Sequence, residues 1–231
     1  MHQLRLFEMR LSGEGSGLLA RRRYAILLAA LVVLILANPI AETASQARFV
    51  VIGGAVIFML ACLQSADTHV HLRRVAQPLV LVWLVLNLPL PGLTASWVVT
   101  AASVLLIALC LILLWLVAHQ LVQAERVDGE LLCGAVAAYL LFGVFWAETY
   151  NLINFAVPGA FAESGGRTLS KSALIYFSFT TLTTTGYGDI TPVLPLVRMW
   201  SVFEAIIGTI YNATVIARLV SLYGVQVRRQ D

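Results

Sequence analysis

The sequence is poor in charge. Asp, Glu, Lys and Arg make up 12% of its 231 residues, whereas 60% are hydrophobic and the mean hydropathy is +0.87. Soluble domains carry about a quarter charged residues and about half apolar ones. A single soluble core cannot hide this much apolar surface, whereas the hydrocarbon of a bilayer solvates it directly. The composition therefore excludes an ordinary soluble domain and indicates a membrane protein.

Residues that carry chemistry are also scarce. Three cysteines stand in or beside apolar runs at no metal-like spacing, and we interpret them as small buried hydrophobes: Cys62, Cys110 and Cys133. His69 and His71, beside Arg73 and Arg74, are interpreted as residues of a solvated inner loop rather than a metal pair. No nucleophile–base pair or phosphate-binding loop is present. The sequence therefore argues against an enzyme and predicts no cofactor.

Long apolar runs are abundant. After a basic segment, residues 1–23, they span residues 24–40, 49–64, 75–90, 97–118, 131–157 and 197–223. The fourth run has no charged residue, and its 22 residues reach about 33 Å as a helix, enough to cross a hydrocarbon layer of about 30 Å. We therefore predict an all-α membrane protein with six transmembrane helices.

The distribution of basic residues indicates the orientation of the chain. With the N-terminus inside, eleven basic residues fall on or near the inner side: Arg5, Arg10, Arg21, Arg22, Arg23, Arg73, Arg74, Arg126, Arg218, Arg228 and Arg229. Four fall on the outer side: Arg48, Arg167, Lys171 and Arg198. We predict a multi-pass protein of the cell membrane, in contact with lipid, with both termini cytoplasmic. The net charge of +3 then reflects topology and not nucleic-acid binding.

The segment between the fifth and sixth runs departs from this pattern. Pro158-Gly159 and Gly165-Gly166 mark an external loop. Ser170-Lys171-Ser172 is a plausible helix start, and the apolar residues continue to Leu182. These 13 residues give about 20 Å of helix, too short to cross. We predict a re-entrant pore helix here, followed by an extended selectivity-filter loop between helices five and six.

The loop after this half-helix reads Thr183-Thr184-Thr185-Gly186-Tyr187-Gly188-Asp189. Glycines at alternate positions leave the backbone free to place its carbonyls. Non-helical backbone at membrane depth is tolerated only inside protein or beside a wet cavity, and a dehydrated cation can partner the carbonyl oxygens. We expect the Tyr187 ring to point away from the ion path, and Asp189 to add negative potential at the external mouth and to brace the loop.

The string from Thr181 to Asp189 resembles the signature of potassium channels, commonly T-x-T-T-V-G-Y-G-D, with Thr185 in place of the usual valine. The resemblance extends over residues 129–224. It implies a homotetramer whose filter backbone binds K⁺ as the permeant ligand at Thr184, Thr185, Gly186, Tyr187 and Gly188. It also implies support of the filter by Thr181, Thr183 and Asp189. Because Thr185 would coordinate through its carbonyl and stays β-branched, we expect selectivity to survive.

The sixth helix is expected to line the inner vestibule. Gly208 falls where bacterial potassium channels place a hinge glycine, and a hinge and a packing contact are equal alternatives for it. The lining register is proposed from helical spacing: Ala205, Thr209, Asn212, Ile216 and Val220. Glu204 either hydrogen-bonds behind the pore helix, which we favour, or faces the cavity. Glu148 is interpreted as an interfacial residue.

The predicted domains are a cytoplasmic segment (1–23), a four-helix domain in the position of a voltage sensor (24–128), a pore domain (129–224) and a short cytoplasmic tail (225–231). Residues 97–118 lack the arginines of a voltage sensor, in which each charge gains only about 2.3 kcal/mol per 100 mV. We therefore expect weak or absent voltage dependence. The tail is too short for a ligand-sensing domain.

The predicted function is passive, potassium-selective conduction. One alternative is a non-selective cation channel, which Thr185 alone favours. Another is an ion-transporter subunit, although such transporters generally need four pore loops in one chain and this sequence has one. A membrane enzyme or assembly scaffold would need a motif that is missing here.

Overall fold

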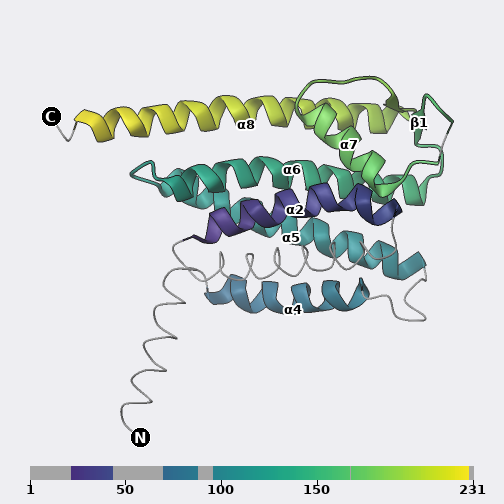
Figure 1. Ribbon diagram of the computed structural model, residues 1–231, viewed down its shortest axis with the longest axis horizontal. Helices are drawn as coiled ribbons and strands as arrows, with labels where there is room; N and C mark the ends of the chain where they lie inside the picture. The colour runs from purple at the N-terminus through teal and green to yellow at the C-terminus, as the bar shows by residue number, and fades with distance from the viewer. Residues whose placement is uncertain (1–21, 44–69, 88–95, 167, 229–231) are drawn as a thin grey trace, which may run out of the picture.

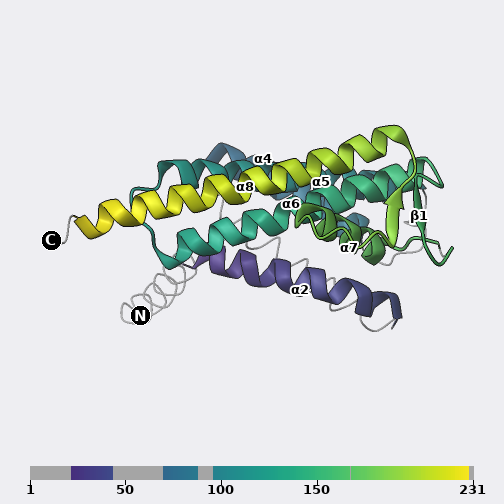
Figure 2. The same cartoon turned by 90° about the horizontal axis from the view of Figure 1, so that it is seen from above.

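The computed structural model of this protein describes residues 22–43, 70–87, 96–166 and 168–228. Its helices are α2 (Arg23–Thr43), α4 (Val70–Leu86), α5 (Ser96–Gln123), α6 (Gly129–Ala156), α7 (Lys171–Leu182) and α8 (Pro195–Arg228). Two short strands, β1 (Phe161–Glu163) and β2 (Ile190–Pro192), pair antiparallel. The long helices lie side by side, with α8 along one face and α4 along the opposite face (Figure 1), and α2 and α4 at opposite edges when the bundle is seen from above (Figure 2).

Four of these helices are long and apolar enough to cross a membrane: Arg23–Ile40, Ser96–Gln123, Gly129–Ala156 and Pro195–Gly224. The structure is therefore that of a mostly helical, multi-pass membrane protein. The predicted run at residues 49–64 lies outside the described residues. The run at 75–90 overlaps α4, which has 17 residues. The prediction of six membrane spans is therefore confirmed only for these four helices as candidates, and the total of six stays a prediction.

The first turns of α4 correct one prediction. Because the helix begins at Val70, His71, Arg73 and Arg74 are helical, and the prediction that they lie in a loop was wrong. The apolar run begins only at residue 75, and the loop was predicted from that boundary. A helix can nevertheless extend beyond its apolar stretch, since its backbone hydrogen bonds stay internal whatever the side chains are. His69 lies outside the described residues.

The main apolar core forms where α2, α5 and α6 meet, with α4 against α5. Leu27 and Leu31 of α2, Leu109 and Leu113 of α5, and Leu141 of α6 are almost fully buried there. Interdigitating leucines of this kind fill the space between helices at the density of a protein interior. The core therefore attaches α2, α4 and α5 to α6, which is the first helix of the predicted pore domain.

Polar contacts fix one end of this bundle. Arg23 Nη2 donates to Gln120 Oε1 over 2.9 Å, and the backbone N–H of Tyr24 donates to Glu130 Oε2 over 2.9 Å. Arg218 Nη2 donates to two carbonyls at the end of α5, Val122 O at 2.9 Å and Ala124 O at 3.0 Å. A cation on the last carbonyls of a helix satisfies groups that have no intrahelical partner. The starts of α2 and α6 and the last part of α8 thus meet the end of α5.

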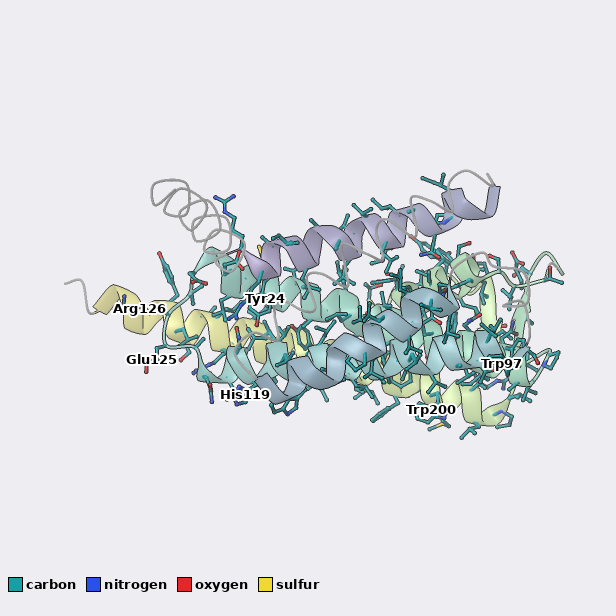
Figure 3. All side chains as sticks on the ribbon, turned by 90° about the horizontal axis from the view of Figure 1, so that it is seen from below. Tyr24, Trp97, His119, Glu125, Arg126 and Trp200 are labelled. Carbon is teal, nitrogen blue, oxygen red and sulfur yellow. The ribbon has the colours of Figure 1, made fainter. Side chains whose placement is uncertain are left out.

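The two ends of the bundle carry different residues. Tyr24, His119, Glu125 and Arg126 lie at one end, and Trp97 and Trp200 lie toward the other (Figure 3). The predicted inner and outer basic residues are thereby separated, since Arg23 and Arg218 meet α5 at the first end, whereas Arg198 donates to Pro192 O of β2. Which end faces the cytoplasm stays a prediction.

Candidate functional site

The site is built around the short helix α7, which lies between α6 and α8 (Figure 1). Ser170 caps its first turn, because its Oγ accepts from the backbone N–H of Ala173 at 3.2 Å. The helix begins at Lys171 and ends at Leu182, so the predicted start within Ser170-Lys171-Ser172 and the predicted end at Leu182 are confirmed. Its 12 residues give about 18 Å, well short of a membrane crossing.

The N-terminal end of α7 is held by an ion pair. Lys171 Nζ pairs with Glu148 Oε1 of α6, and the Glu148 side chain is only 4% exposed. Ser103 of α5 donates to the other carboxylate oxygen over 3.1 Å. Glu148 is therefore buried among side chains of its own chain, and its place at the membrane interface stays a prediction. A buried carboxylate is tolerated when a cation and further hydrogen bonds compensate it. No pattern along the chain predicts that Lys171 packs beside Glu148.

The middle of α7 is held by a buried polar cluster. Ser178 Oγ lies 2.6 Å from Glu204 Oε1 of α8 and 2.9 Å from Gly143 O of α6. Tyr150 of α6 donates from its hydroxyl to Glu204 Oε2 over 2.6 Å. Glu204 is thus hydrogen-bonded behind α7, the helix predicted as the pore helix, as the favoured alternative expects. Ser178 and Tyr150 were missed because neither residue belongs to a recognisable motif.

Glycines let the neighbouring helices approach α7 closely. A β-carbon on Gly143 would collide with the Phe179 ring, and one on Gly208 would collide with the Leu182 carbonyl oxygen. Tyr139 also donates to this carbonyl from its hydroxyl, over 3.2 Å. Gly208 is therefore a packing contact in this structure. Its role as a hinge or gate stays a prediction.

The loop after α7 folds back onto the last turn of that helix. The backbone N–H groups of Thr184 and Gly186 donate to Thr181 O at 2.9 Å and Thr180 O at 3.0 Å. Thr183 Oγ1 lies 2.7 Å from Phe179 O and 2.9 Å from Thr185 Oγ1. The hydroxyl of Thr185, the one departure from the potassium channel signature, is therefore used inside the loop.

The backbone of this loop alternates in handedness. Thr184, Gly186 and Gly188 have φ of +59°, +53° and +79°, whereas Thr185 and Tyr187 between them have negative φ. For Thr184, a β-branched residue, this conformation costs about 1–2 kcal/mol. The strain at Thr184 was not foreseen, because the sequence signalled positive φ only at the glycines. Such strain persists where the surrounding structure imposes it, and it is typical of functional segments.

The outer end of the loop is tied to the β-ribbon. Asp189 O accepts from the backbone N–H of Ser164 at 2.9 Å and from its hydroxyl at 3.1 Å. A side-chain hydrogen bond also links Tyr176 to Asp189. The Tyr187 ring stacks on Tyr176, with ring centroids 6.1 Å apart and an interplanar angle of 6°. Both ends of the loop are thus fixed by their own chain.

The loop itself is uncovered in the single chain. Residues 183–189 are all exposed, and the Tyr187 side chain is 70% exposed. On α8, the predicted lining residues Thr209, Asn212, Ile216 and Val220 are also exposed, and Ala205 is half-buried. One chain therefore presents one side of a site and does not enclose it.

Comparisons with known proteins find similarity in the same part of the chain. Residues 134–224, about two fifths of the chain, match the model of a protein family described as "Ion channel". These residues lie inside the predicted pore domain. The chain is also similar to two pore potassium channel c of Oryza sativa subsp. japonica, with 42% identity over 72 residues. That match covers 31% of this chain and 14% of the relative, so the chain spans a small part of that protein's length. No solved structure matches at a significant level.

The helices and the matched segment point to the same class of protein. Four described helices are long and apolar enough to cross a membrane, and residues 134–224 match the ion channel family model. Residues 134–224 of this multi-pass membrane protein are therefore similar to an ion channel.

Proposed function

We propose that this protein is one subunit of a homotetrameric, potassium-selective channel that conducts K⁺ passively. The observation that carries the proposal is the alternating backbone of residues 184–188, held at the end of a short helix between two candidate membrane-spanning helices. The relative, by its name a potassium channel, supports the same choice of ion.

The alternating φ values explain how a backbone can bind a cation. Alternating handedness turns successive peptide groups the same way, so that N–H groups gather on one side and carbonyls on the other. In a β-strand the carbonyls point in opposite directions in turn, and no such row of oxygens forms. A row of carbonyl oxygens can replace the water shell of a dehydrated cation.

A homotetramer would complete the site. The loop is exposed in one chain, and a single row of carbonyls surrounds no ion, whereas four rows about a common axis would. We assign K⁺ binding to the backbone of Thr184, Thr185, Gly186 and Tyr187, continued by Gly188 at the outer end. Contacts of Thr181, Thr183 and Asp189 with the loop ends support their assignment as bracing residues.

The inner part of the pore is assigned to α8 and the end of α7. The C-terminal end of a helix carries a partial negative charge of about half an elementary charge, and four α7 ends around one axis would favour a cation. Thr209, Asn212 and Ile216 are exposed on α8 and available to face the ion path. We propose that α7 enters the membrane and that the loop returns, as a re-entrant segment.

The proposed channel is not steeply voltage-gated. Helix α5 contains no lysine or arginine, and each charge that crosses the field supplies only about 2.3 kcal/mol per 100 mV. Arg73 and Arg74 are adjacent in the first turns of α4, and not at three-residue spacing. Conductance of the reconstituted protein should therefore vary weakly with voltage. A steep, sigmoidal conductance–voltage curve would refute this expectation.

The test of the function is ion flux through the purified protein in liposomes. We expect K⁺ flux that barium blocks, and a reversal potential in mixed K⁺ and Na⁺ that follows the K⁺ gradient. Empty liposomes provide the baseline. Equal permeability to both ions would support the non-selective alternative and defeat selectivity. Absence of flux, with a tetramer verified by its mass, would defeat the channel assignment.

A further inference from the structure

Two carboxyl groups are buried beside α7, and their surroundings differ. Glu148 is paired with Lys171, as described above. The Glu204 side chain is fully buried, at 0% exposure, and its oxygens contact only hydroxyls, those of Ser178 and Tyr150, each at 2.6 Å. Among the described residues, no lysine or arginine pairs with Glu204. Burial of an unpaired carboxylate costs several kcal/mol, whereas a neutral carboxyl needs only hydrogen bonds.

The hydrogen-bond geometry leads to the same conclusion. Ser178 Oγ lies within hydrogen-bond distance of two acceptors, Glu204 Oε1 and Gly143 O, but a hydroxyl has a single proton to donate. If Glu204 is ionised, one of these two contacts has no proton. If Glu204 is protonated on Oε1, it donates to Ser178, Ser178 donates to Gly143 O, and Tyr150 donates to Glu204 Oε2. Every contact in the cluster is then a hydrogen bond.

We infer that Glu204 is held as a neutral carboxylic acid and that its proton positions the pore helix. The cluster joins three helices, because Ser178 lies on α7, Gly143 and Tyr150 on α6, and Glu204 on α8. Its effect on conduction rests on the proposed function. Removal of the proton would leave a bare charge behind the filter and weaken the hold on α7, so conduction should fall at alkaline pH.

The titratable groups that face Glu204 are few. Tyr150 faces it from α6, and the residue that faces it from α7 is Ser178, which carries no charge. The ion pair beside α7 is Glu148–Lys171. It lies at the N-terminal end of that helix, and its two charges compensate each other. Alkaline sensitivity that is specific to the pore helix is therefore assigned to Glu204.

The protonation is tested without any measurement of flux. The infrared spectrum of the purified full-length protein at neutral pH should contain a protonated-carboxyl C=O band that is missing in Glu204→Gln. Glu125→Gln is the matched control, because Glu125 is an exposed carboxylate far from α7 (Figure 3), and this change should leave the band intact. A wild-type spectrum in which Glu204→Gln removes no such band would overturn the inference, whether or not the protein conducts.

The positioning role is tested by flux as a function of pH. Glu204→Gln keeps one donor and one acceptor, so it should conduct at neutral pH as the wild type does and should lose the alkaline inhibition. Glu204→Leu and Ser178→Ala should each lower K⁺ flux about fivefold, since loss of one buried hydrogen bond shifts a two-state equilibrium by roughly that factor. The positioning role would be contradicted if Glu204→Gln conducted less than the wild type at neutral pH, or if its alkaline inhibition equalled that of the wild type.

If no variant conducts and the wild type does not conduct either, the proposed function fails, and the infrared test of the proton still stands. If only Glu204→Leu fails to assemble, as judged by size-exclusion chromatography, Ser178→Ala supplies the flux test. Ser178→Ala removes the same hydrogen bond from the α7 side and leaves an alanine, which favours helix formation.

Discussion

Helices α6 and α8 are both candidate membrane spans of the predicted pore domain, yet they differ in how much of their surface the chain covers. In the most apolar 18-residue stretch of α6, half of the residues are buried, whereas in the corresponding stretch of α8 only 11% are buried. Helix α6 packs against α2, α5 and α7, and α8 packs mainly against α7. The difference indicates that the chain itself covers much of the surface of α6, whereas most of the surface of α8 is left for other molecules to cover.

The residues that α8 buries form one narrow stripe. Val197, Ser201, Glu204 and Gly208 recur at spacings of three and four, as expected for one face of a helix. The other faces contain exposed polar residues, among them Thr209 and Asn212. The Thr209 hydroxyl donates to Ala205 O of its own helix over 2.9 Å, but Asn212 carries an amide, to which lipid tails offer no hydrogen bonds, whereas water or other copies of the chain do. The exposed surface of α8 therefore supports an assembly around a wet axis.

The largest expected effect lies in the loop that four subunits would share. Gly186→Ala should abolish K⁺ flux and leave the tetramer assembled. A β-carbon there meets no atom of its own chain, but φ of +53° costs a residue with a β-carbon about 1–2 kcal/mol, and four copies would repeat this cost. Gly129→Ala is the matched control, since Gly129 has open space and no positive φ. Unchanged flux in Gly186→Ala would contradict the filter assignment.

The exposed faces of the two helices provide the next test. Asn212→Cys on α8 should react with a positively charged thiol reagent added from the inner side, and the product should block K⁺ flux. Val136→Cys on the exposed face of α6 should be insensitive, because a lipid-facing thiol stays un-ionised and unreactive. Wild-type protein tests the background from the native cysteines. Equal modification of both positions would erase the distinction between α6 and α8.

A smaller effect is expected at the closest contact of α8. Gly208→Ala should destabilise the purified protein by about 1–3 kcal/mol, because its β-carbon meets the Leu182 carbonyl. Gly224→Ala on the same helix meets no atom and should be neutral or slightly stabilising. Thermal unfolding of the two variants measures the difference. If Gly208→Ala is as stable as Gly224→Ala but changes open probability, Gly208 acts as a hinge and not as a packing residue.

Local signals in the sequence were sufficient for the elements of the pore domain. Ser170 and the apolar residues up to Leu182 located α7, because an N-cap and a short apolar run depend on neighbouring residues alone. The start of α4 was misplaced for the converse reason. Its basic first turn has no apolar pattern, so hydropathy placed Arg73 and Arg74 in a loop.

The partners of buried charges could not be predicted from sequence. Its sequence position predicts an interfacial place for Glu148 but not its partners Lys171 and Ser103, which are 23 and 45 residues away along the chain. For Glu204, sequence reasoning favoured a place behind the pore helix but could not name Ser178 or Tyr150. The free energy of a buried carboxyl depends on atoms within a few ångströms, and only the packing of helices decides which atoms these are.

The sequence by itself determined that the chain crosses a membrane, where its short helix lies and which residues form the loop, because hydropathy, caps and glycine spacing act over a few residues. Only the tertiary structure decided how α7 is held, that Thr184 adopts a left-handed backbone, and that α8 is left largely uncovered. These features arise from contacts between helices that are distant in sequence, and a pattern along one chain does not record such contacts.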